Sequence, residues 1–500
     1  MSGDMLCWAV ILVLGPLLAA IVSFLVPGSG RLAARAVCLL HGGVLPLVTR
    51  LLLRAGPQDL AVGGWPVPVG IRLGLDGLSL LMIGMTALVG AAVTIYAGGY
   101  FTLRIDIARD AARHEERSRF FWPLWLMLWA ALNGLYLSRD FFNIYVTLEL
   151  IGLAAVLLTA LSGKPAARLA ALRYLLAGVL AATLFLLGVA LLYRCCGVLD
   201  MAAAGEAATT GPLLWSACAL LTCALLVKSA LFPLHFWLPP AHANALAPVS
   251  AILSGLVIKA PLYLLLRFWC EVFAPLLPAA ATIIPGGLGA AALVWGTLLA
   301  LQQQRLKMLI AYSTVAQVGS VMTALPLLGG GSDGLVWQAA VMLIVSHACA
   351  KSAMFLAAGA IFLHAGHDRI DDLSGIKEEL PTAALAVVAA GISLIGLPPS
   401  AGFVGKWLLL EVALTGGRWW WGLMPVLGSL LSAAYVYRIA KPILTYRAPF
   451  PYHRQAVPPV MEWAALFLAL LALLLGLFAG LPLELLESGG APVIVGGGGA

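Results

Sequence analysis

Four lysines lie well inside long apolar stretches, where a charged side chain is rare and can take part in proton transfer. They are Lys228, Lys259, Lys351 and Lys406. A lysine near the centre of a membrane helix costs roughly 2.5 to 3.5 kcal/mol. A buried ammonium without a partner also has a lowered pKa, so that it can bind and release protons near neutral pH. One central carboxylate, Glu149, cannot neutralise all four, and this imbalance predicts a proton path.

Two further residues lie close to these lysines in the sequence. His347 precedes Lys351 by one helical turn and should share its face, which favours a common relay. The alternative is a structural histidine that is hydrogen-bonded to a backbone carbonyl. Glu411 follows Lys406 by five positions, and the alternative to a functional role is a simple pair near an interface. A structural role as the partner of a carboxylate also remains open for any single lysine.

Helix-breaking residues lie next to two of the lysines. The run after Lys228 reads KSALFPLHFWLPPAHANALAP, and the run before Lys406 reads SLIGLPPSAGFVGK. Proline removes a backbone donor and clashes with the preceding turn, so neither helix can continue unbroken. Irregular backbone at membrane depth is tolerated against protein or a wet cavity. The two breaks therefore indicate an ion path and an internal repeat, although Pro and Gly are common in membrane helices generally.

The elements that must position these residues are membrane helices. The chain has 500 residues, 62% of them hydrophobic and only 10% charged, which excludes a soluble globular protein. Apolar stretches of about 20 residues recur along the whole sequence and predict an all-α polytopic membrane protein with about fourteen transmembrane helices. The expected spans lie near residues 5–26, 33–53, 75–96, 120–137, 141–161, 170–193, 213–234, 248–268, 280–301, 306–327, 335–363, 383–414, 419–439 and 461–481.

The order of these spans predicts the domain organisation. Residues 1–119 should hold three helices and a basic cytoplasmic loop, and residues 446–500 the last helix and a short tail. Between them, residues 120–270 and 275–445 should form two five-helix repeats, with the broken helix fourth in each, as helices 7 and 12. An offset of five spans is odd, so the two repeats should have opposite orientations in the membrane.

The distribution of basic residues predicts the topology. Clusters of arginine and lysine near residues 104–119 and 438–454 fall on one side of the membrane, which should be cytoplasmic. Both termini should then lie on the non-cytoplasmic side, in a membrane that we expect to be the bacterial inner membrane. The first span lacks the features of a cleaved signal peptide and should be retained.

Several classes of site are not supported by the sequence. The eight cysteines form no CxxC pair and no iron–sulfur spacing, and no glycine-rich phosphate loop follows a strand. We therefore expect no bound cofactor and no metal. The net charge of +7 mostly reflects topology, so we expect no nucleic acid as a partner.

Five segments, in order, resemble a known family. They are DFFNIYVTLEL at 140–150, the run 228–267, RLKMLIAYSTVAQVG at 305–319, SHACAKSAMFLAAGAI at 346–361 and the GFVGK motif that ends at Lys406. Together they resemble the antiporter-like subunits of respiratory complex I, which are shared with Mrp-type sodium/proton antiporters and membrane-bound hydrogenases. The resemblance covers nearly the whole chain.

The resemblance implies fourteen helices, two inverted repeats and a proton half-channel in each repeat. It implies that Glu149 and Lys228 are the glutamate–lysine pair of helices five and seven. Four further residues would continue the path: Lys259 in helix eight, His347 and Lys351 in helix eleven, and Lys406 in helix twelve. His242 falls in the loop after the first broken helix. Pro240, Pro261 and Ser320 depart from common family residues and put the local hinge geometry in doubt.

The leading hypothesis is a proton-translocating subunit of a multisubunit complex of the NADH-quinone oxidoreductase or hydrogenase type. Its partners would be the other membrane subunits and the lipid bilayer, and any oxidoreductase activity would belong to the whole assembly. The first alternative is a D-type subunit of a multisubunit sodium/proton antiporter, and the second is a quinone-binding subunit. The chain ends about 20 residues after the last span, so we expect no long lateral helix. The KSALFPLHFWLP run is closest to the group that holds the D-type antiporter subunits and the hydrogenase subunits.

Overall fold

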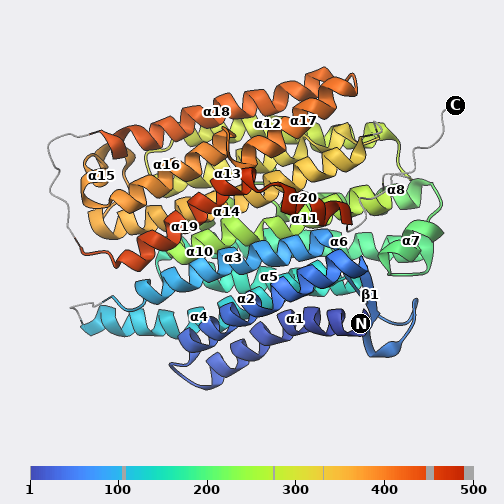
Figure 1. The fold of residues 1–500 in the computed structure, drawn as a ribbon, viewed down its shortest axis with the longest axis horizontal. Coiled ribbons are helices and arrows are strands. Elements are labelled where there is room, and N and C mark those ends of the chain that lie inside the picture. The colour runs from blue at the N-terminus through green and yellow to red at the C-terminus, as the bar shows by residue number, and fades with distance from the viewer. Residues whose placement is uncertain (1, 104–107, 274–275, 330–331, 446–454, 489–500) are drawn as a thin grey trace.

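The computed structural model describes residues 2–103, 108–273, 276–329, 332–445 and 455–488. Arg104, Arg447 and Arg454, which contribute to the predicted topology, lie outside these ranges. The described part is largely helical, as predicted, and its helices run roughly side by side in one bundle (Figure 1).

The long helices follow the predicted spans. They are α1 (Ser2–Leu25), α2 (Gly30–Ala55), α3 (Gly77–Tyr100), α4 (Ala108–Leu137), α5 (Phe141–Ala160), α6 (Pro165–Cys196), α12 (Ile283–Leu301), α13 (Leu306–Met322), α14 (Asp333–Ala365), α18 (Trp419–Leu444) and α19 (Pro459–Leu477). A further span, Ala247–Phe273, joins α10 (Ala247–Ile252), a π-helical turn (Leu253–Val257), α11 (Lys259–Arg267) and a second π-helical segment (Phe268–Phe273). Within the described ranges, these make twelve segments long and apolar enough to cross a membrane.

The two remaining predicted spans are the broken ones. Span seven is divided into α8 (Pro212–Lys228) and α9 (Leu238–Asn244), and span twelve into α16 (Pro381–Ile395) and α17 (Ala401–Thr415). Both interruptions fall at the proline-rich runs, which confirms the predicted breaks beside Lys228 and Lys406.

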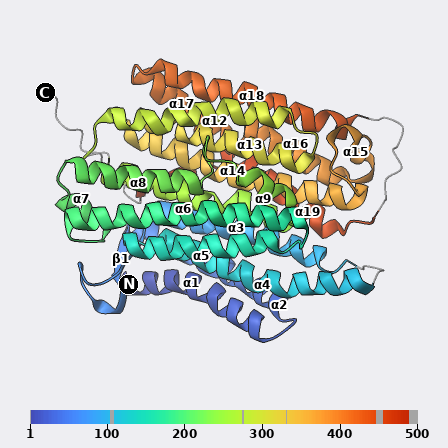
Figure 2. The same ribbon diagram turned by 180° about the vertical axis from the view of Figure 1, so that it is seen from behind.

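Short elements lie at the two ends of the bundle. They are β1 (Gln58–Ala61), β2 (Arg72–Leu75), α7 (Met201–Ala207), α15 (Ile376–Glu379), α20 (Gly480–Ser488) and 3-10 turns at Val62–Gly64, Ala279–Thr282, Leu325–Leu327 and Ile370–Asp372. The start of α1, β1, α7 and α20 share one end, which we call the hairpin end, and α15 marks the other, the α15 end (Figure 1). Seen from behind, the broken helix α8 and α9 runs beside α6 (Figure 2).

The centre of the bundle is α14, in which every residue of the most apolar window is buried. This helix is rich in alanine and other small or unbranched residues, which allow close helix packing. Its neighbours include α10, α13, α16, α17 and α19. The polar side chains of α14 can therefore contact only protein groups or trapped water. His347 and Lys351 are among them.

A small antiparallel hairpin, β1 with β2, was not predicted by the sequence. Its strands have only four residues each. Arg72 of β2 fixes the hairpin to the bundle through an ion pair with Asp200 at 2.5 Å, and it also pairs within the hairpin with Asp59 at 3.2 Å. The sequence pattern around residues 58–75 lacks a long alternation of polar and apolar residues. The hairpin thus depends on distant charges rather than on strand propensity.

A network of four charged residues closes the hairpin end. Asp76, which caps the first turn of α3, pairs with Arg267 at 2.7 Å and with Arg139 at 2.5 Å, and Glu271 also pairs with Arg267. Arg267 lies near the end of the predicted span 248–268, and in the structure it is the last residue of α11 and only 2% exposed. Burial alone would raise the pKa of Asp76, but the charges of Arg267 and Arg139 hold it well below its usual range.

Candidate functional site

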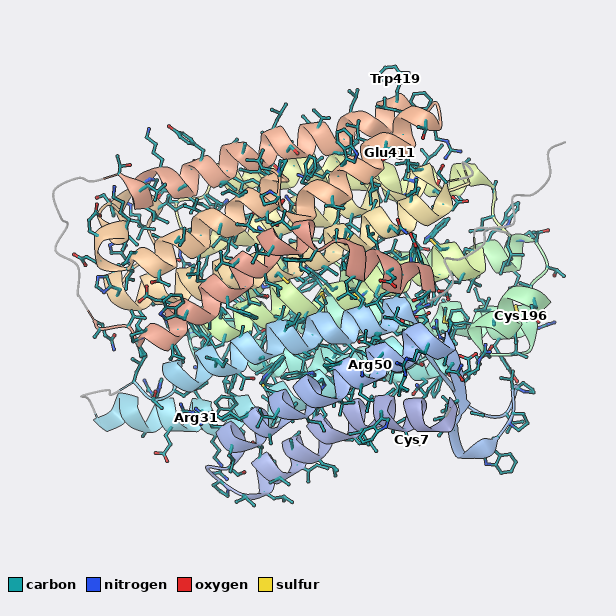
Figure 3. The ribbon with its side chains drawn as sticks, in the orientation of Figure 1. Cys7, Arg31, Arg50, Cys196, Glu411 and Trp419 are labelled. Carbon is teal, nitrogen blue, oxygen red and sulfur yellow. The ribbon has the colours of Figure 1, made fainter. Side chains whose placement is uncertain are left out.

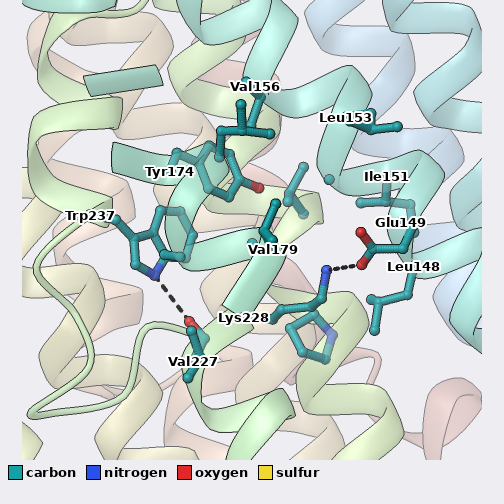
Figure 4. Close-up of a pocket in the computed structure, with 16 residues that line it drawn as sticks. Leu148, Glu149, Ile151, Leu153, Val156, Tyr174, Val179, Val227, Lys228 and Trp237 are labelled. Carbon is teal, nitrogen blue, oxygen red and sulfur yellow. Dashed lines mark hydrogen bonds and ion pairs between the residues drawn. The ribbon is translucent and has the colours of Figure 1, made fainter. Parts of the chain in front are cut away.

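An ion pair between α5 and α8 contains the predicted pair of residues. Lys228 Nζ lies 2.7 Å from Glu149 Oε1, in a small pocket of about 60 Å³ (Figure 4). Lys228 is the last residue of α8, so its side chain starts where the helix stops. The Lys228 side chain is 10% exposed and that of Glu149 28%, so the carboxylate is the more accessible partner.

The helix break behind Lys228 is held by an aromatic side chain. Trp237 Nε1 donates to the carbonyl of Val227 at 3.0 Å, which satisfies an acceptor at the end of α8 (Figure 4). The Trp237 ring stacks on Tyr174 of α6, with ring centroids 4.2 Å apart. Within the break, Ala230 has a left-handed φ of 54°, which costs energy for a residue with a Cβ. The lysine is therefore positioned by an irregular segment that Trp237 fixes against α6.

Lys259 and His347 form the next contact. Lys259 is the first residue of α11, directly after the π-helical turn, and its Nζ donates to the Ser254 carbonyl at 2.5 Å. The same Nζ lies 3.1 Å from His347 Nδ1. Lys259 is 0% exposed and His347 2%. The predicted relay residues of helices eight and eleven are thus in direct contact, and a π-helical turn is a frequent feature of functional sites.

Lys351 lies one turn further along α14. Its Nζ donates to Ser313 Oγ and to the Ile310 carbonyl at 3.2 Å, both on α13. It also lies 5.5 Å from the centre of the Tyr435 ring, within range of a cation–π interaction. No carboxylate in the described chain forms an ion pair with Lys351.

Lys406 is held by the carbonyls that the second break exposes. Its Nζ donates to the Leu394 carbonyl at 3.1 Å, the Ile395 carbonyl at 2.9 Å and Ser429 Oγ at 3.3 Å. Leu394 and Ile395 end α16, where carbonyls have no partner inside the helix and carry the negative end of its dipole. The second lysine at a break therefore has backbone and hydroxyl partners instead of a carboxylate.

A polar cluster connects the surroundings of Lys351 with those of Lys406. Gln317 Nε2 donates to Tyr435 OH at 3.0 Å, to Ser432 Oγ at 2.9 Å and to the Leu394 carbonyl at 3.3 Å. The Tyr435 ring contacts Lys351, and the Leu394 carbonyl also accepts from Lys406. Gln317 and Tyr435 were not among the residues predicted from the sequence. The available signal was the pair Ser313 and Gln317, which are polar and four positions apart in an apolar helix.

A buried histidine and a fifth buried lysine lie at the α15 end. His242 belongs to α9, is 0% exposed, and both of its ring nitrogens lack a hydrogen-bond partner among the described residues. Lys307 Nζ donates to the Ala245 carbonyl at 2.9 Å and to Ser250 Oγ at 3.3 Å, and Ser250 Oγ donates to the His242 carbonyl. Lys307 is the second residue of the predicted span 306–327 and was not among the predicted buried lysines. It is 7% exposed because it is in the first turn of α13, against α9.

Glu411 does not join the cluster of buried residues. Its side chain is exposed on α17 and lies at the outer edge of the bundle (Figure 3). Lys406, on the same helix, contacts carbonyls and Ser429 instead. The predicted alternative of a pair between Glu411 and Lys406 is therefore wrong, because the two side chains leave α17 toward different surroundings.

The described residues contain no group of three or more His, Cys, Asp or Glu side chains placed to hold a metal ion. Polar contacts in the bundle instead form short series of lysine, histidine, hydroxyl and carbonyl groups. His242 and one nitrogen of His347, Nε2, are buried without partners. Groups of this kind are commonly satisfied by buried water, and a series of them can conduct protons.

Comparisons with known proteins agree with this architecture. Residues 138–432 match the family described as NADH:quinone oxidoreductase/Mrp antiporter, TM. The chain is 36% identical to the N subunit of the NADH-quinone oxidoreductase of Desulforudis audaxviator, with 86% of this chain and 84% of the relative covered. It is 28% identical to the D subunit of the Na(+)/H(+) antiporter of Bacillus subtilis, with 89% and 87% covered.

A solved structure has the same fold. A chain of the Mrp complex from Dietzia sp. DQ12-45-1b superposes with a TM-score of 0.85 at 26% identity, and 96% of each chain is covered. The predicted resemblance is confirmed by the family match and by these relatives. This chain belongs to the NADH:quinone oxidoreductase/Mrp antiporter transmembrane family.

Proposed function

We propose that this chain translocates protons through its buried lysines and histidines, as one membrane subunit of a multisubunit energy-coupling complex. One observation carries the proposal. Among the residues that the structure describes, Lys228 is the only one of the four predicted buried lysines that faces a carboxylate, and the others contact groups that can exchange protons or accept hydrogen bonds. A charge buried without a counter-charge is expensive, so such positions are occupied where function requires them.

The proposed path starts at the Glu149–Lys228 pair. Glu149 stabilises the charged form of Lys228, and a weakening of this pair favours release of the lysine proton toward the centre. Lys259 and His347 exchange a proton directly through their 3.1 Å contact. The described structure has no direct side-chain bond from Lys228 to Lys259, so water would complete this step.

The second part of the path runs from Lys351 to Lys406. Lys351 lies against Tyr435, and Gln317 joins Tyr435 to the carbonyl that Lys406 shares. Moving one proton against 100 mV costs about 2.3 kcal/mol. A shift of two pKa units in one coupled lysine corresponds to about 2.7 kcal/mol, so electrostatic coupling between neighbours is sufficient.

The exposure of Glu149 indicates how a partner could drive the path. Its side chain is 28% exposed although it lies in the middle of α5. A neighbouring membrane subunit that covered this carboxylate would change the strength of its pair with Lys228. We propose that redox chemistry, where the assembly performs any, belongs to other subunits and that this chain binds no cofactor.

We also propose the orientation of the chain in the membrane. The start of α1 and α20 share the hairpin end of the bundle (Figure 1). Arg438, Lys441 and Arg119 lie at the other end, where the excess of basic residues favours the cytoplasm. The α15 end would then face the cytoplasm of a bacterial cell and the hairpin end the opposite side.

The test uses the assembled complex in sealed vesicles, with proton uptake followed by a pH-sensitive dye. Lys228→Ala and Glu149→Ala should each abolish proton uptake while the complex still assembles, because each removes one half of the starting pair. Lys377→Ala is the matched control, since Lys377 is an exposed lysine at the α15 end. Full pumping by both variants, with the control also active, contradicts the proposal.

A second candidate function is sodium/proton exchange. It is favoured by the match to a chain of an Mrp complex and to the D subunit of an antiporter. Sodium needs several oxygen ligands, which in the described bundle would have to be carbonyls such as those of Leu394 and Ile395. Proton movement that requires sodium and is absent with potassium supports this function over proton pumping alone.

A further inference from the structure

A polar pocket of about 500 Å³ opens at the α15 end, between α1, α2, α3 and α4. Its lining includes Ser23, Arg31, Gly98, Arg119 and Trp122. Arg31 lies toward the α15 end of the bundle, where α4 begins (Figure 3). None of these residues belongs to the proposed proton path, so the pocket needs its own explanation.

Hydrogen-bond donors in this pocket lack partners. Arg31 Nε is buried without an acceptor, and Ser23, which is only 4% exposed, has an unpartnered Oγ. The N-terminus of α2 contributes more donors, because Ser29 does not cap it. The Ser29 hydroxyl donates instead to the carbonyls of Val26 and Val22. Uncapped N–H groups, a guanidinium and a hydroxyl in one pocket are the chemistry that binds a phosphate.

Two glycines, Gly98 and Gly30, leave room for the side chain of Arg31. A Cβ on Gly98 of α3 would lie 3.2 Å from Arg31 Nε, closer than ordinary packing allows. A Cβ on Gly30 would lie 2.5 Å from Trp122 Cβ and 2.6 Å from Ser23 Oγ. The two glycines therefore let α2 approach α3 and α4 with Arg31 directed along the pocket.

The charges around the pocket match a group that carries both signs. Arg31 and Arg119 are positive, and Glu115 and Glu116 line the same pocket. A phosphate alone would be repelled by the two carboxylates. A phosphate joined to an ammonium can place the phosphate near the arginines and the ammonium near the glutamates.

An apolar groove of about 700 Å³ lies on α1, α4 and α5. Its lining includes Ile21, Phe24, Phe120, Met127 and Leu157. The pocket and the groove share no lining residue, but they use neighbouring positions on the same two helices. Ser23 of the pocket precedes Phe24 of the groove on α1, and Arg119 precedes Phe120 on α4. A polar pocket and an apolar groove on one helix pair fit an amphipathic ligand with hydrocarbon chains.

We propose that the pocket and groove together bind one phospholipid with an amine headgroup, such as phosphatidylethanolamine, from the leaflet at the α15 end. Its phosphate would contact Arg31, Arg119, Ser23 and the first turn of α2, and its acyl chains would fill the groove. The lipid fixes the α1–α2 hairpin, which has the least buried helices of the bundle, against α3 and α4. This proposal is independent of the direction and identity of the transported ion.

The test measures lipid bound to the assembled complex by native mass spectrometry, with titration of short-chain phosphatidylethanolamine after delipidation. Arg31→Gln should weaken binding about tenfold or more, because it removes charge-assisted bonds to the phosphate. Arg35→Gln is the matched control, since Arg35 is exposed on the same helix and does not line the pocket. Ala160→Phe, which fills the groove, should reduce lipid binding while the phosphate pocket stays intact.

Inorganic phosphate is the second probe and separates a lipid from a soluble anion. Two results together support the proposal: inorganic phosphate at equal concentration does not displace the short-chain lipid, and Ala160→Phe weakens binding of that lipid. Equal binding by phosphate, unchanged lipid binding in Arg31→Gln, or no lipid on the assembled wild-type complex overturns it. Ala160→Phe keeps the test valid if Arg31→Gln does not fold.

Discussion

The two broken helices hold their lysines by different means. At the first break, Lys228 faces the carboxylate of Glu149, across from the end of α8. At the second break, Lys406 points back at the carbonyls that end α16 and has no carboxylate partner in the described chain. One charge is neutralised by a titratable group on another helix, and the other by fixed dipoles.

This difference gives the two lysines different roles in the proposed mechanism. A carboxylate can be weakened or protonated from outside, so the Glu149–Lys228 pair can respond to a neighbouring subunit. Backbone carbonyls cannot titrate, so Lys406 has a constant environment and suits the release of a proton. The asymmetry predicts that loss of the Glu149 carboxylate destabilises the chain more than loss of the Lys406 ammonium does.

The largest loss of stability is expected at Asp76, whose carboxylate pairs with both Arg139 and Arg267. Asp76→Asn should lower the free energy of unfolding by about 3 kcal/mol, because Arg139 and the buried Arg267 lose a shared counter-charge. The pKa of Asp76 is depressed by these arginines, so its contribution is present above the ordinary aspartate pKa and is lost as the pH falls below about 4.

The measurement is chemical unfolding of the chain in lipid nanodiscs at several pH values. The difference between wild type and Asp76→Asn should stay constant from pH 5 to 8 and shrink at lower pH. Asp59→Asn serves as control, because Asp59 is half exposed and pairs only with Arg72 at 3.2 Å. If Asp76→Asn lowers the free energy of unfolding no more than Asp59→Asn does, the comparison between charges with and without carboxylate partners loses its basis.

The next effect compares the two broken helices directly. Glu149→Gln leaves Lys228 without a counter-charge and should cost about 2 kcal/mol, a value reduced from that of a fully buried pair because Glu149 is partly exposed. Lys406→Met removes a cation that has no carboxylate and should cost less than about 1 kcal/mol. Both should stop proton uptake. Equal losses of stability in the two variants would show that the lysines are held alike.

Much of this arrangement could be predicted from the sequence because its signals are local. A lysine in an apolar stretch is visible without any structure, and so are the prolines and glycines that break a helix. These features depend on composition and spacing. The scarcity of carboxylates indicated only that Glu149 cannot neutralise all four lysines, and its pairing with Lys228 was implied by the family resemblance.

The parts that could not be predicted depend on contacts between distant positions. Lys307 follows a polar segment and has the pattern of a loop residue, but α9, some 62 positions away, covers it. Gln317 meets Tyr435 across 118 positions. The β1–β2 hairpin depends on Asp200, 128 positions from Arg72. No local pattern contains this information.

A smaller effect is expected at the polar cluster between Lys351 and Lys406. Gln317→Leu should reduce the rate of proton uptake about tenfold, because Tyr435 and the Leu394 carbonyl lose their shared donor. Gln317→His retains an N–H donor and should restore most of the rate. Tyr435→Phe should have a similar effect to Gln317→Leu, and the double variant should be no slower than either single variant. A double variant that is slower by the product of both effects would show that the two residues act separately.

The smallest effect is expected for Glu411→Gln, which is the same substitution as Glu149→Gln but on the helix that follows the second break. Glu411 is exposed on α17 and does not contact Lys406, so neither stability nor proton uptake should change beyond about 0.5 kcal/mol or twofold. Measured beside Glu149→Gln in the same vesicles, it separates the loss of a membrane carboxylate from the loss of a lysine partner. A large loss of proton uptake in Glu411→Gln would mean that the second broken helix also uses a carboxylate, and that Lys406 leaves its carbonyl partners during transport.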